Sequence, residues 1–341
     1  MPGWQDVQNV GIRDVAKVAG VSVTTVSHAL SGRRPVNPET RERVLRASES
    51  LGYLPDPHAG GLRASRTWVI GVLGEAVLTT PYAGQLVAGA QEVADEHSYV
   101  VIALDSGFSP ERETRNIAML GRRRVDGVVM ARMYHQSVDV PAELRGVPLV
   151  LANAVTSDPS VSWIAPDERL IATDAVAHLL AHGHRRIGFA TTLDDTAAAA
   201  GRAEGYRDTL RAAGIEVDES LIVRSPSTAA GGRHSAEALL GRADRPTAVF
   251  CFNDEIAMGL YQGAQGRGLR IPEDLSVVGV DDLRLISEAL QPGLTTVALP
   301  HRELGRWSVA KIFQSLEDPS TPAEQVFVRC ALVERGSVAH V

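Results

Sequence analysis

Apolar residues recur along this chain in two different rhythms, and the change between them falls near residue 67. Before that point they lie three and four positions apart, which predicts short amphipathic helices over residues 11–19 and 23–30 and a third beginning at Pro38. After it, short apolar runs alternate with amphipathic stretches, which predicts parallel strands joined by helices. The pattern therefore indicates a small all-α head followed by a larger α/β domain.

The first two predicted helices are separated by a tight turn at Gly20. Glycine tolerates a left-handed backbone, and Ser22 is placed to cap a helix that starts at Val23. On that helix Val26 and Leu30 share the side expected to face the core. The outward positions are Val23, Thr24, Ser27 and His28. Two short helices joined in this way form a helix-turn-helix, whose second helix enters the DNA major groove.

The third helix has a strong start signal, because Asn37 can cap it and Pro38 suits its first position. We expect Val44, Leu45 and Leu51 on one face and an end at Gly52. Three small helices could also form a generic cap on an enzyme. The charge distribution favours DNA binding over that alternative.

Charge is distributed unevenly along the 341 residues, whose formal net charge is −7. Residues 1–66 hold nine basic and six acidic side chains, a net charge of +3, so the remainder carries −10. A basic head on an acidic body indicates that the head meets phosphate while the body repels nucleic acid.

The head resembles the lac repressor (LacI/GalR) family of bacterial transcription factors. The segments that carry the resemblance are residues 12–22, 25–27, 36–41 and 51–55. The resemblance implies that Val23, Thr24 and His28 read bases and that Ser22, Thr25 and Ser27 contact phosphates. Family members usually carry arginine where this chain has His28, so the common arginine–guanine contact is missing.

Residues 54–66 contain two prolines and two glycines, which marks a boundary between domains. The segment could be a flexible tether. The resemblance implies instead a hinge helix that folds on DNA, with Leu62 wedged into the minor groove. We place the DNA-binding domain at residues 1–57 and the hinge at 58–67.

The remainder, residues 68–341, is predicted to form two doubly wound parallel-sheet subdomains, as in periplasmic binding proteins. We assign 68–167 with 299–328 to one subdomain and 168–298 with 329–341 to the other. Ligands of such sheets bind beyond the carboxyl ends of the strands. The polar residues that directly follow predicted strands are Asn153, Asn253 and Asp281. They could bind a ligand or simply cap the next helix or turn.

The resemblance to the family extends over this larger domain. It is carried by residues 183–189, 202–206, 247–254, 271–282 and 294–297. It implies that Arg202, Asn153, Asn253 and Asp281 contact a small polar effector, for which a guanidinium fork and carboxylate or amide oxygens suit vicinal hydroxyls. Tyr82 and His301 stand where relatives line the pocket, often with aromatic rings. Few aromatic residues predict weak stacking on a sugar.

Other functional classes find little support. Two cysteines, Cys251 and Cys330, are too few for a disulfide framework, and Cys251 lies in an apolar run that predicts burial. His182 and His184 form an H-x-H pair without a carboxylate cluster, which argues against a metal site. No phosphate loop or nucleophile elbow follows a strand, and no membrane span or signal peptide is recognisable. We expect a cytoplasmic protein with no catalytic activity and no cofactor.

We therefore interpret the chain as a transcriptional regulator, specifically a repressor, that binds a pseudo-palindromic operator as a homodimer. Its operator affinity would be set by a small polar effector, most readily a sugar. Two alternatives stay open: the same architecture controlled by a partner protein, or a ligand-binding α/β protein whose basic head is incidental.

Overall fold

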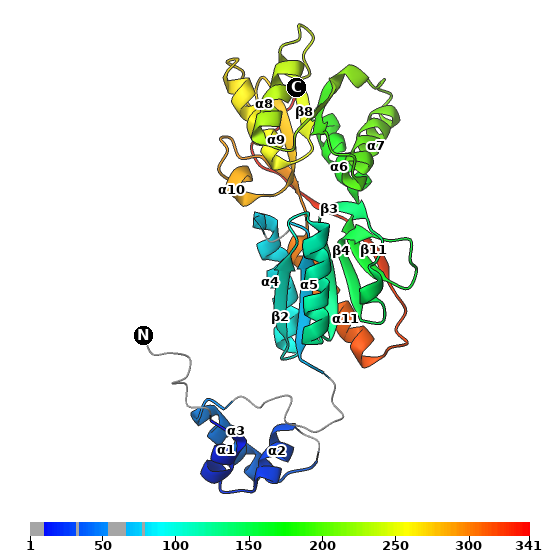
Figure 1. Ribbon diagram of the computed structural model, residues 1–341. Coiled ribbons are helices and arrows are strands. Elements are labelled where there is room, and N and C mark those ends of the chain that lie inside the picture. Colours follow the sequence, from blue (N-terminus) through cyan, green and yellow to red (C-terminus); the bar gives the residue numbers. More distant parts are fainter. Residues whose placement is uncertain (1–9, 32–33, 54–65, 77–78) are drawn as a thin grey trace. The chain divides into compact units, whose positions relative to one another are not determined.

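The computed structural model describes residues 10–31, 34–53, 66–76 and 79–341, and the side chains of Ser31, Tyr82 and Ala83 lie outside that description. The chain divides into two compact units, which we call the head (residues 1–67) and the large unit (residues 68–341). Each is considered by itself. Figure 1 shows the helices of the head and, in the large unit, sheets flanked by helices.

The described part of the head contains three helices, α1 (Ile12–Ala19), α2 (Val23–Ser31) and α3 (Pro38–Ser50). The predicted turn is confirmed, because Gly20 has a φ of 65°, in the left-handed region. The predicted caps are also confirmed. Ser22 Oγ accepts from the backbone N–H of Thr25 at 3.1 Å, and Asn37 Oδ1 accepts from that of Glu39 at 3.0 Å.

The core of the head is built from one residue of each helix, since Val15, Val26 and Val44 are all fully buried. The expectation that Leu45 faces this core is wrong, because its exposed fraction is 47%. Ala47 and Ser48 occupy the buried positions instead. They lie three and four residues after Val44, which is the helical repeat, whereas Leu45 is rotated by about 100°.

The first sheet of the large unit has six parallel strands in the order β11-β5-β4-β3-β1-β2. Its strands are β1 (Val69–Gly74), β2 (Val100–Asp105), β3 (Gly127–Ser137), β4 (Leu149–Val155), β5 (Ser162–Pro166) and β11 (Gln325–Val328). The helices packed with it are α4 (Pro81–Glu96), α5 (Pro110–Arg123), the short η3 (Ala142–Leu144) and α11 (His301–Glu317).

The second sheet has the order β12-β10-β9-β8-β6-β7, in which β12 runs antiparallel to β10 and the other pairings are parallel. Its strands are β6 (Ile187–Thr192), β7 (Ile222–Ser225), β8 (Ala248–Cys251), β9 (Ser276–Asp281), β10 (Thr295–Ala298) and β12 (Ala331–Val333). Its helices are α6 (Glu168–Ala181), α7 (Ala197–Ala212), η4 (Glu219–Leu221), α8 (Ala229–Leu240), α9 (Asp254–Gln265) and α10 (Arg284–Ser287).

The predicted fold class is confirmed, and the chain crosses between the two sheets three times, after β5, β10 and β11. The sequence reading did not assign β5, β10, α10 or α11. The sequence of β5 does not alternate between apolar and polar residues in the way that reveals a half-exposed strand, because all five of its residues are buried, and the strand ends in proline. The apolar face of α11 is interrupted by the buried polar residues Ser308 and Lys311, which weakens its periodicity.

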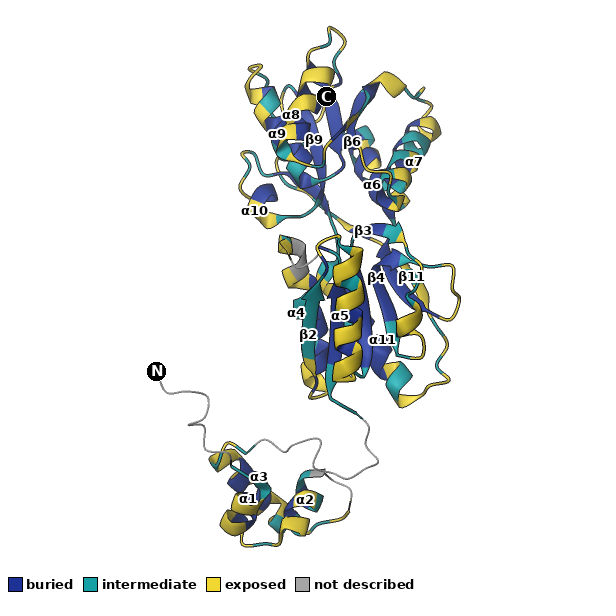
Figure 2. Cartoon of the chain, in the orientation of Figure 1, coloured by how far each residue is buried: buried dark blue, intermediate teal, exposed yellow. Residues whose placement is uncertain are grey.

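Both sheets are buried between their helices, whose outer faces are exposed (Figure 2). The core of the second sheet includes Phe189, Phe250 and Tyr206, all fully buried. The predicted burial of Cys251 is confirmed, since its exposed fraction is 0%.

Candidate functional site

The second helix of the head presents one buried and one exposed side. Val26 and Ala29 are buried, and Leu30 packs against the same core. The outward side matches the expectation, with Val23 41% exposed, Thr24 and Ser27 exposed and His28 half-buried. Ser22 and Thr25 are joined by a 2.8 Å hydrogen bond between their hydroxyl groups at the start of the helix. A small polar surface is thus held on a rigid element.

Around this helix the head carries exposed basic side chains. The exposed basic residues of its described part are Arg13, Lys17, Arg34, Arg41, Arg43 and Arg46. Arg46 forms an exposed ion pair with Glu42 at 3.7 Å. Such a set of cations can neutralise phosphate groups, so the head is suited to a nucleic-acid backbone.

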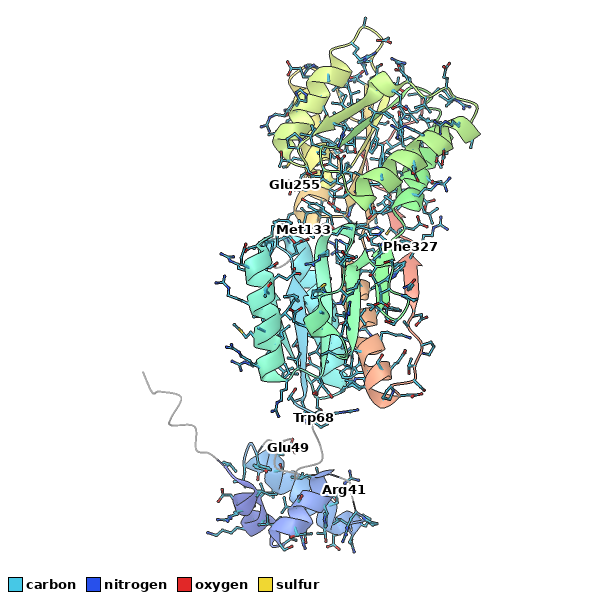
Figure 3. All side chains as sticks on the ribbon, turned by 45° about the vertical axis from the view of Figure 1, so that its right-hand side comes forward. Arg41, Glu49, Trp68, Met133, Glu255 and Phe327 are labelled. Atoms are coloured by element: carbon cyan, nitrogen blue, oxygen red, sulfur yellow. The ribbon has the colours of Figure 1, made fainter. Side chains whose placement is uncertain are left out.

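A cavity of about 90 Å³ lies where strands of both sheets end, and Figure 3 labels two of its lining residues, Met133 and Glu255. The first sheet contributes the end of β3 and Asn153 of β4. The second contributes residues after β8, the last residue of β9 and the N-terminal half of α7. The complete lining is Met133, Tyr134, His135, Asn153, Glu168, Ala198, Arg202, Ser227, Phe252, Asn253, Glu255, Asp281, Leu299 and His301.

A buried ionic network forms one wall of this cavity. Arg202 donates from Nε to Glu168 Oε2 at 2.8 Å, donates from Nη1 to the carbonyl oxygen of Phe252, and lies 4.4 Å from the centre of the Phe252 ring. His135 Nδ1 lies 3.5 Å from Glu168 Oε1. Burial opposes ionisation of Glu168, but Arg202 and His135 outweigh it and lower the pKa of that carboxyl group.

Asn153 and Asn253 both line the cavity, and both also support the backbone. Asn153 adopts a left-handed φ of 56°, and its amide donates to the carbonyl oxygens of Arg132 and Met133 at 3.1 and 3.3 Å. Asn253 caps α9, since its Oδ1 accepts from the N–H of Ile256 at 2.8 Å. The capping alternative therefore holds for Asn253, which can offer a ligand only its remaining hydrogen-bonding capacity.

Asp281 ends β9 and lines the cavity, and it interacts electrostatically with a second, fully buried carboxyl group, that of Asp254. Asp254 accepts from Thr296 Oγ1 at 2.6 Å and from the N–H of Leu283 at 2.8 Å. Burial and the neighbouring charge of Asp281 raise the pKa of Asp254 well above its usual range. Gly279 makes room for this carboxyl group, because a Cβ there would overlap Asp254 Oδ1.

His301 lies at the first turn of α11, where its ring nitrogen Nε2 is buried. Burial lowers the pKa of His301 to about 4, although nearby Glu168 favours the charged form. The imidazole is therefore neutral near pH 7. Burial also raises the pKa values of Tyr134 and Glu255 on the same lining.

The structure brings together five of the six residues predicted to contact an effector, namely Asn153, Arg202, Asn253, Asp281 and His301. The side chain of Tyr82 lies outside the described residues, and so does all of Leu62. The sequence reading missed Glu168 and His135. Both lie near the carboxyl ends of strands, where ligands of such sheets bind, but this becomes visible only when β3 is extended to Ser137 and β5 is recognised as a strand.

Two negative findings apply to the residues that the structure describes. Within those ranges, no three His, Cys, Asp or Glu side chains are arranged to hold a metal ion. No helix in the same ranges combines the length and apolar character needed to cross a membrane.

Comparisons with known proteins match both units. Residues 11–56 match the family described as bacterial regulatory proteins of the lacI family, and residues 176–338 match the periplasmic binding protein-like domain. The ribose operon repressor of Haemophilus influenzae is 32% identical over 96% of this chain and 98% of its own length. The catabolite control protein A of Priestia megaterium is 35% identical over 87% of this chain and 90% of its own.

Solved structures agree with these matches. The lac repressor dimer bound to operator and the anti-inducer ONPF superposes with a TM-score of 0.76 at 28% identity, covering 97% of this chain and 99% of that one. The regulator CelR in complex with cellobiose gives a TM-score of 0.71 at 29% identity, over 96% of this chain and 100% of that one. A LacI-family regulator from Enterococcus faecium with bound ribose gives 0.68 at 27%, over 80% and 99%.

Proposed function

Because the chain belongs to the LacI family of bacterial regulatory proteins, we propose that it is a sequence-specific transcriptional repressor controlled by a small effector. The observation that carries the proposal is that one chain joins a helix-turn-helix head with a cavity lined from two mostly parallel sheets. The head binds operator DNA, and the effector binds in the cavity. The protein acts in the cytoplasm and catalyses no reaction.

The exposed side of α2 reads the operator in this proposal. Val23, Thr24 and His28 meet base edges, and Val23 offers only an apolar contact such as that to a thymine methyl group. Ser22, Thr25 and Ser27 contact phosphates. Leu62, outside the described residues, is the proposed minor-groove wedge of a hinge that folds on DNA.

The regulator acts as a homodimer, so that two heads meet the two halves of a pseudo-palindrome. The lac repressor dimer on its operator supports this arrangement by its similarity to the chain. An effector that binds the two arrangements of the dimer unequally would change the spacing of the heads and hence operator affinity.

The lining of the cavity favours a neutral polyhydroxyl effector. Its charged groups are three carboxyl groups, from Glu168, Glu255 and Asp281, and one guanidinium, from Arg202. His301 adds no positive charge near pH 7 because its pKa is about 4. A phosphate or carboxylate ligand would meet a surplus of negative charge, whereas hydroxyl groups can donate to carboxylates and accept from Arg202.

The repressor proposal is tested by selecting random duplex DNA with the purified full-length protein at physiological salt. We expect recovery of a pseudo-palindrome. Binding that is only non-specific and is lost as the salt concentration rises would contradict the proposal, provided that the selection gives the same result when ribose or cellobiose is added.

The effector class is tested separately by calorimetry with D-ribose and ribose 5-phosphate. Ribose is a suitable first probe because it is bound in the similar Enterococcus faecium regulator. We expect the neutral compound to bind more tightly than the phosphate, and Arg202→Met to abolish that binding. Tighter binding of the phosphate would overturn the charge argument.

A further inference from the structure

A second hollow of the large unit lies outside the cavity, between α7 and the edge strand β7. It encloses about 370 Å³, within the range of small-molecule pockets. We call it the α7 groove. Its lining residues are Thr191, Thr192, Asp195, Thr196, Ala199, Ala200, Ala203, Arg207, Ile222 and Arg224.

One polar group on the lining of the α7 groove, the hydroxyl of Thr191, is buried. Side chains alternate along β6, so Thr191 shares a side with Phe189, whose ring stacks on Tyr206 of α7 at 5.3 Å. Thr191 is only 5% exposed, and its Oγ1 has no hydrogen-bond partner among the described residues. A buried hydroxyl without a partner is costly, so a ligand that supplies one gains free energy there.

Two guanidinium groups stand at the mouth of the groove. Arg207 is held by Glu219 through two hydrogen bonds of 2.8 and 2.9 Å. Arg224 pairs with Asp195 at 2.6 Å, but the Asp195 side chain is 91% exposed. An exposed ion pair contributes little free energy, so a ligand carboxylate can replace Asp195 on Arg224 at small cost.

The apolar part of the lining, which we call the alanine floor, is formed by α7 and β7. Ala199, Ala200 and Ala203 lie on one face of α7, and Ile222 faces them from β7. Alanine side chains leave the space that larger residues would fill. The floor therefore suits the body of a small apolar molecule.

We propose that the α7 groove binds a compact carboxylic acid with an apolar body. Its carboxylate pairs with Arg224, its body lies on the alanine floor, and a polar substituent or the carboxylate itself reaches Thr191 Oγ1. This goes beyond the proposed function, because the effector cavity uses other side chains and favours neutral ligands.

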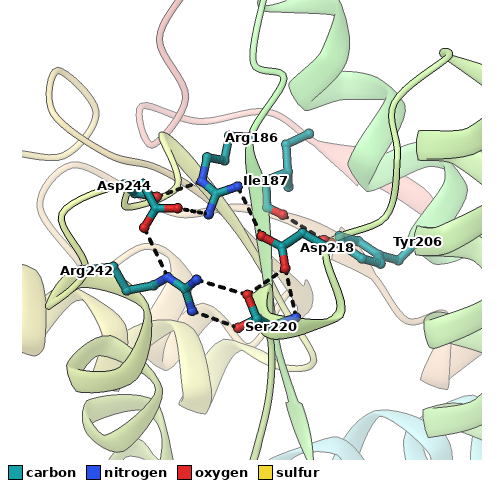
Figure 4. Close-up of polar contacts among 7 residues, drawn as sticks. All are labelled: Arg186, Ile187, Tyr206, Asp218, Ser220, Arg242 and Asp244. Atoms are coloured by element: carbon teal, nitrogen blue, oxygen red, sulfur yellow. Dashed lines mark hydrogen bonds and ion pairs between the residues drawn. The ribbon is translucent and has the colours of Figure 1, made fainter.

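The same helix lines both hollows. Ala198 and Arg202 face the cavity, while Ala199 and Ala203, one position further along, face the groove. Tyr206, in the second half of α7, donates from its hydroxyl to the carbonyl oxygen of Ile187 at 2.7 Å, and Figure 4 marks this contact with a dashed line. A ligand in the groove thus contacts the turns of α7 that carry Ala198 and Arg202 into the cavity.

The test is fluorine NMR of 4-fluorobenzoate with the full-length protein, with 4-fluorobenzyl alcohol as the uncharged analogue. We expect saturable line broadening for the carboxylate and much weaker broadening for the alcohol. Arg224→Gln should weaken binding about tenfold through loss of a charged hydrogen bond. Thr191→Val should weaken it severalfold without loss of stability, because it removes a hydroxyl that has no partner.

The matched control is Arg233→Gln, an exposed arginine of α8 that donates to Gln262 outside the groove. It should leave binding unchanged. Absence of saturable broadening, or equal affinities in Arg224→Gln and Arg233→Gln, overturns the proposal. No arm of the test uses DNA, so its failure is distinct from failure of the repressor proposal.

Discussion

Arg202 donates from Nε to Glu168 Oε2 at 2.8 Å, and each of the two side chains is only 4% exposed. Removing one partner of a buried pair leaves the other charge without compensation. We expect Glu168→Gln to lower the free energy of unfolding by about 3 kcal/mol, measured by urea denaturation at pH 7.

The exposed pair of Arg169 Nη2 and Asp208 Oδ2, which are 2.6 Å apart, provides the control. Arg169→Gln should cost less than about 1 kcal/mol, because solvent screens that pair. Equal losses for the two variants would show that Glu168 and Arg202 do not form the buried pair described above.

The imidazole of His301 should make the protein sensitive to acid. Burial lowers its pKa to about 4, below the value of about 6.5 for an unfolded histidine. The unfolded chain therefore takes up this proton first, and the stability that neutral His301 provides is full above pH 6.5 and lost as the pH falls towards 4.

His301→Gln should remove that loss, which is about 3 kcal/mol between pH 7 and pH 4. The measurement is the free energy of unfolding at several pH values between 7 and 4. His234→Gln, at an exposed position of α8, controls for removing an imidazole in general. Identical pH profiles for wild type and His301→Gln would refute the assignment.

The carboxyl group of Asp254 should make the folded protein less stable as the pH rises, which is the opposite of the effect of His301. Burial and Asp281 raise its pKa, so the folded protein holds this proton more tightly than the unfolded chain does. Its contribution to stability is present below the unfolded value of about 3.9 and is lost as the pH rises through the raised pKa.

Asp254→Asn should relieve that loss, because its amide oxygen can accept from the N–H of Leu283 and its amide nitrogen can donate to Thr296 Oγ1. We expect the variant to become more stable relative to wild type as the pH is raised from 5 to 8. The measurement is the free energy of unfolding from urea denaturation at each pH. A stability difference that does not change with pH would count against the raised pKa.

The two sides of α2 should separate folding from DNA recognition. Val26 is fully buried in the head, so Val26→Ala should cost roughly 2 kcal/mol of stability while the preferred half-site stays the same. His28→Arg should leave stability nearly unchanged and shift the selected half-site towards guanine. An unchanged half-site after His28→Arg would place the base contacts elsewhere.

The features predicted correctly from the sequence are those that depend on residues close to one another in the chain. The turn at Gly20 and the caps at Ser22 and Asn37 depend on neighbours within three residues, and all three were predicted. The expectation that ligands bind beyond the carboxyl ends of the strands likewise identified Asn153 and Asp281, which line the cavity.

The features that escaped prediction depend on distant contacts. Glu168 looks like an ordinary first-turn acid of α6, and its burial becomes visible only when Arg202, thirty-four residues later, reaches it. The unassigned strand β5 lies between β4 and β11, and burial on both faces leaves no alternation to read. Leu45 was misplaced because apolar character alone does not fix which side of a helix is buried.

We propose that this protein couples sequence-specific DNA binding to occupancy of the cavity. This coupling is tested most directly by the operator dissociation constant of the full-length protein at physiological salt, with and without a neutral sugar that binds. We predict that a scrambled duplex binds at least about a thousandfold more weakly than the operator and that the sugar shifts only the operator constant. Equal affinities for operator and scrambled duplex, with or without the sugar, would contradict the account.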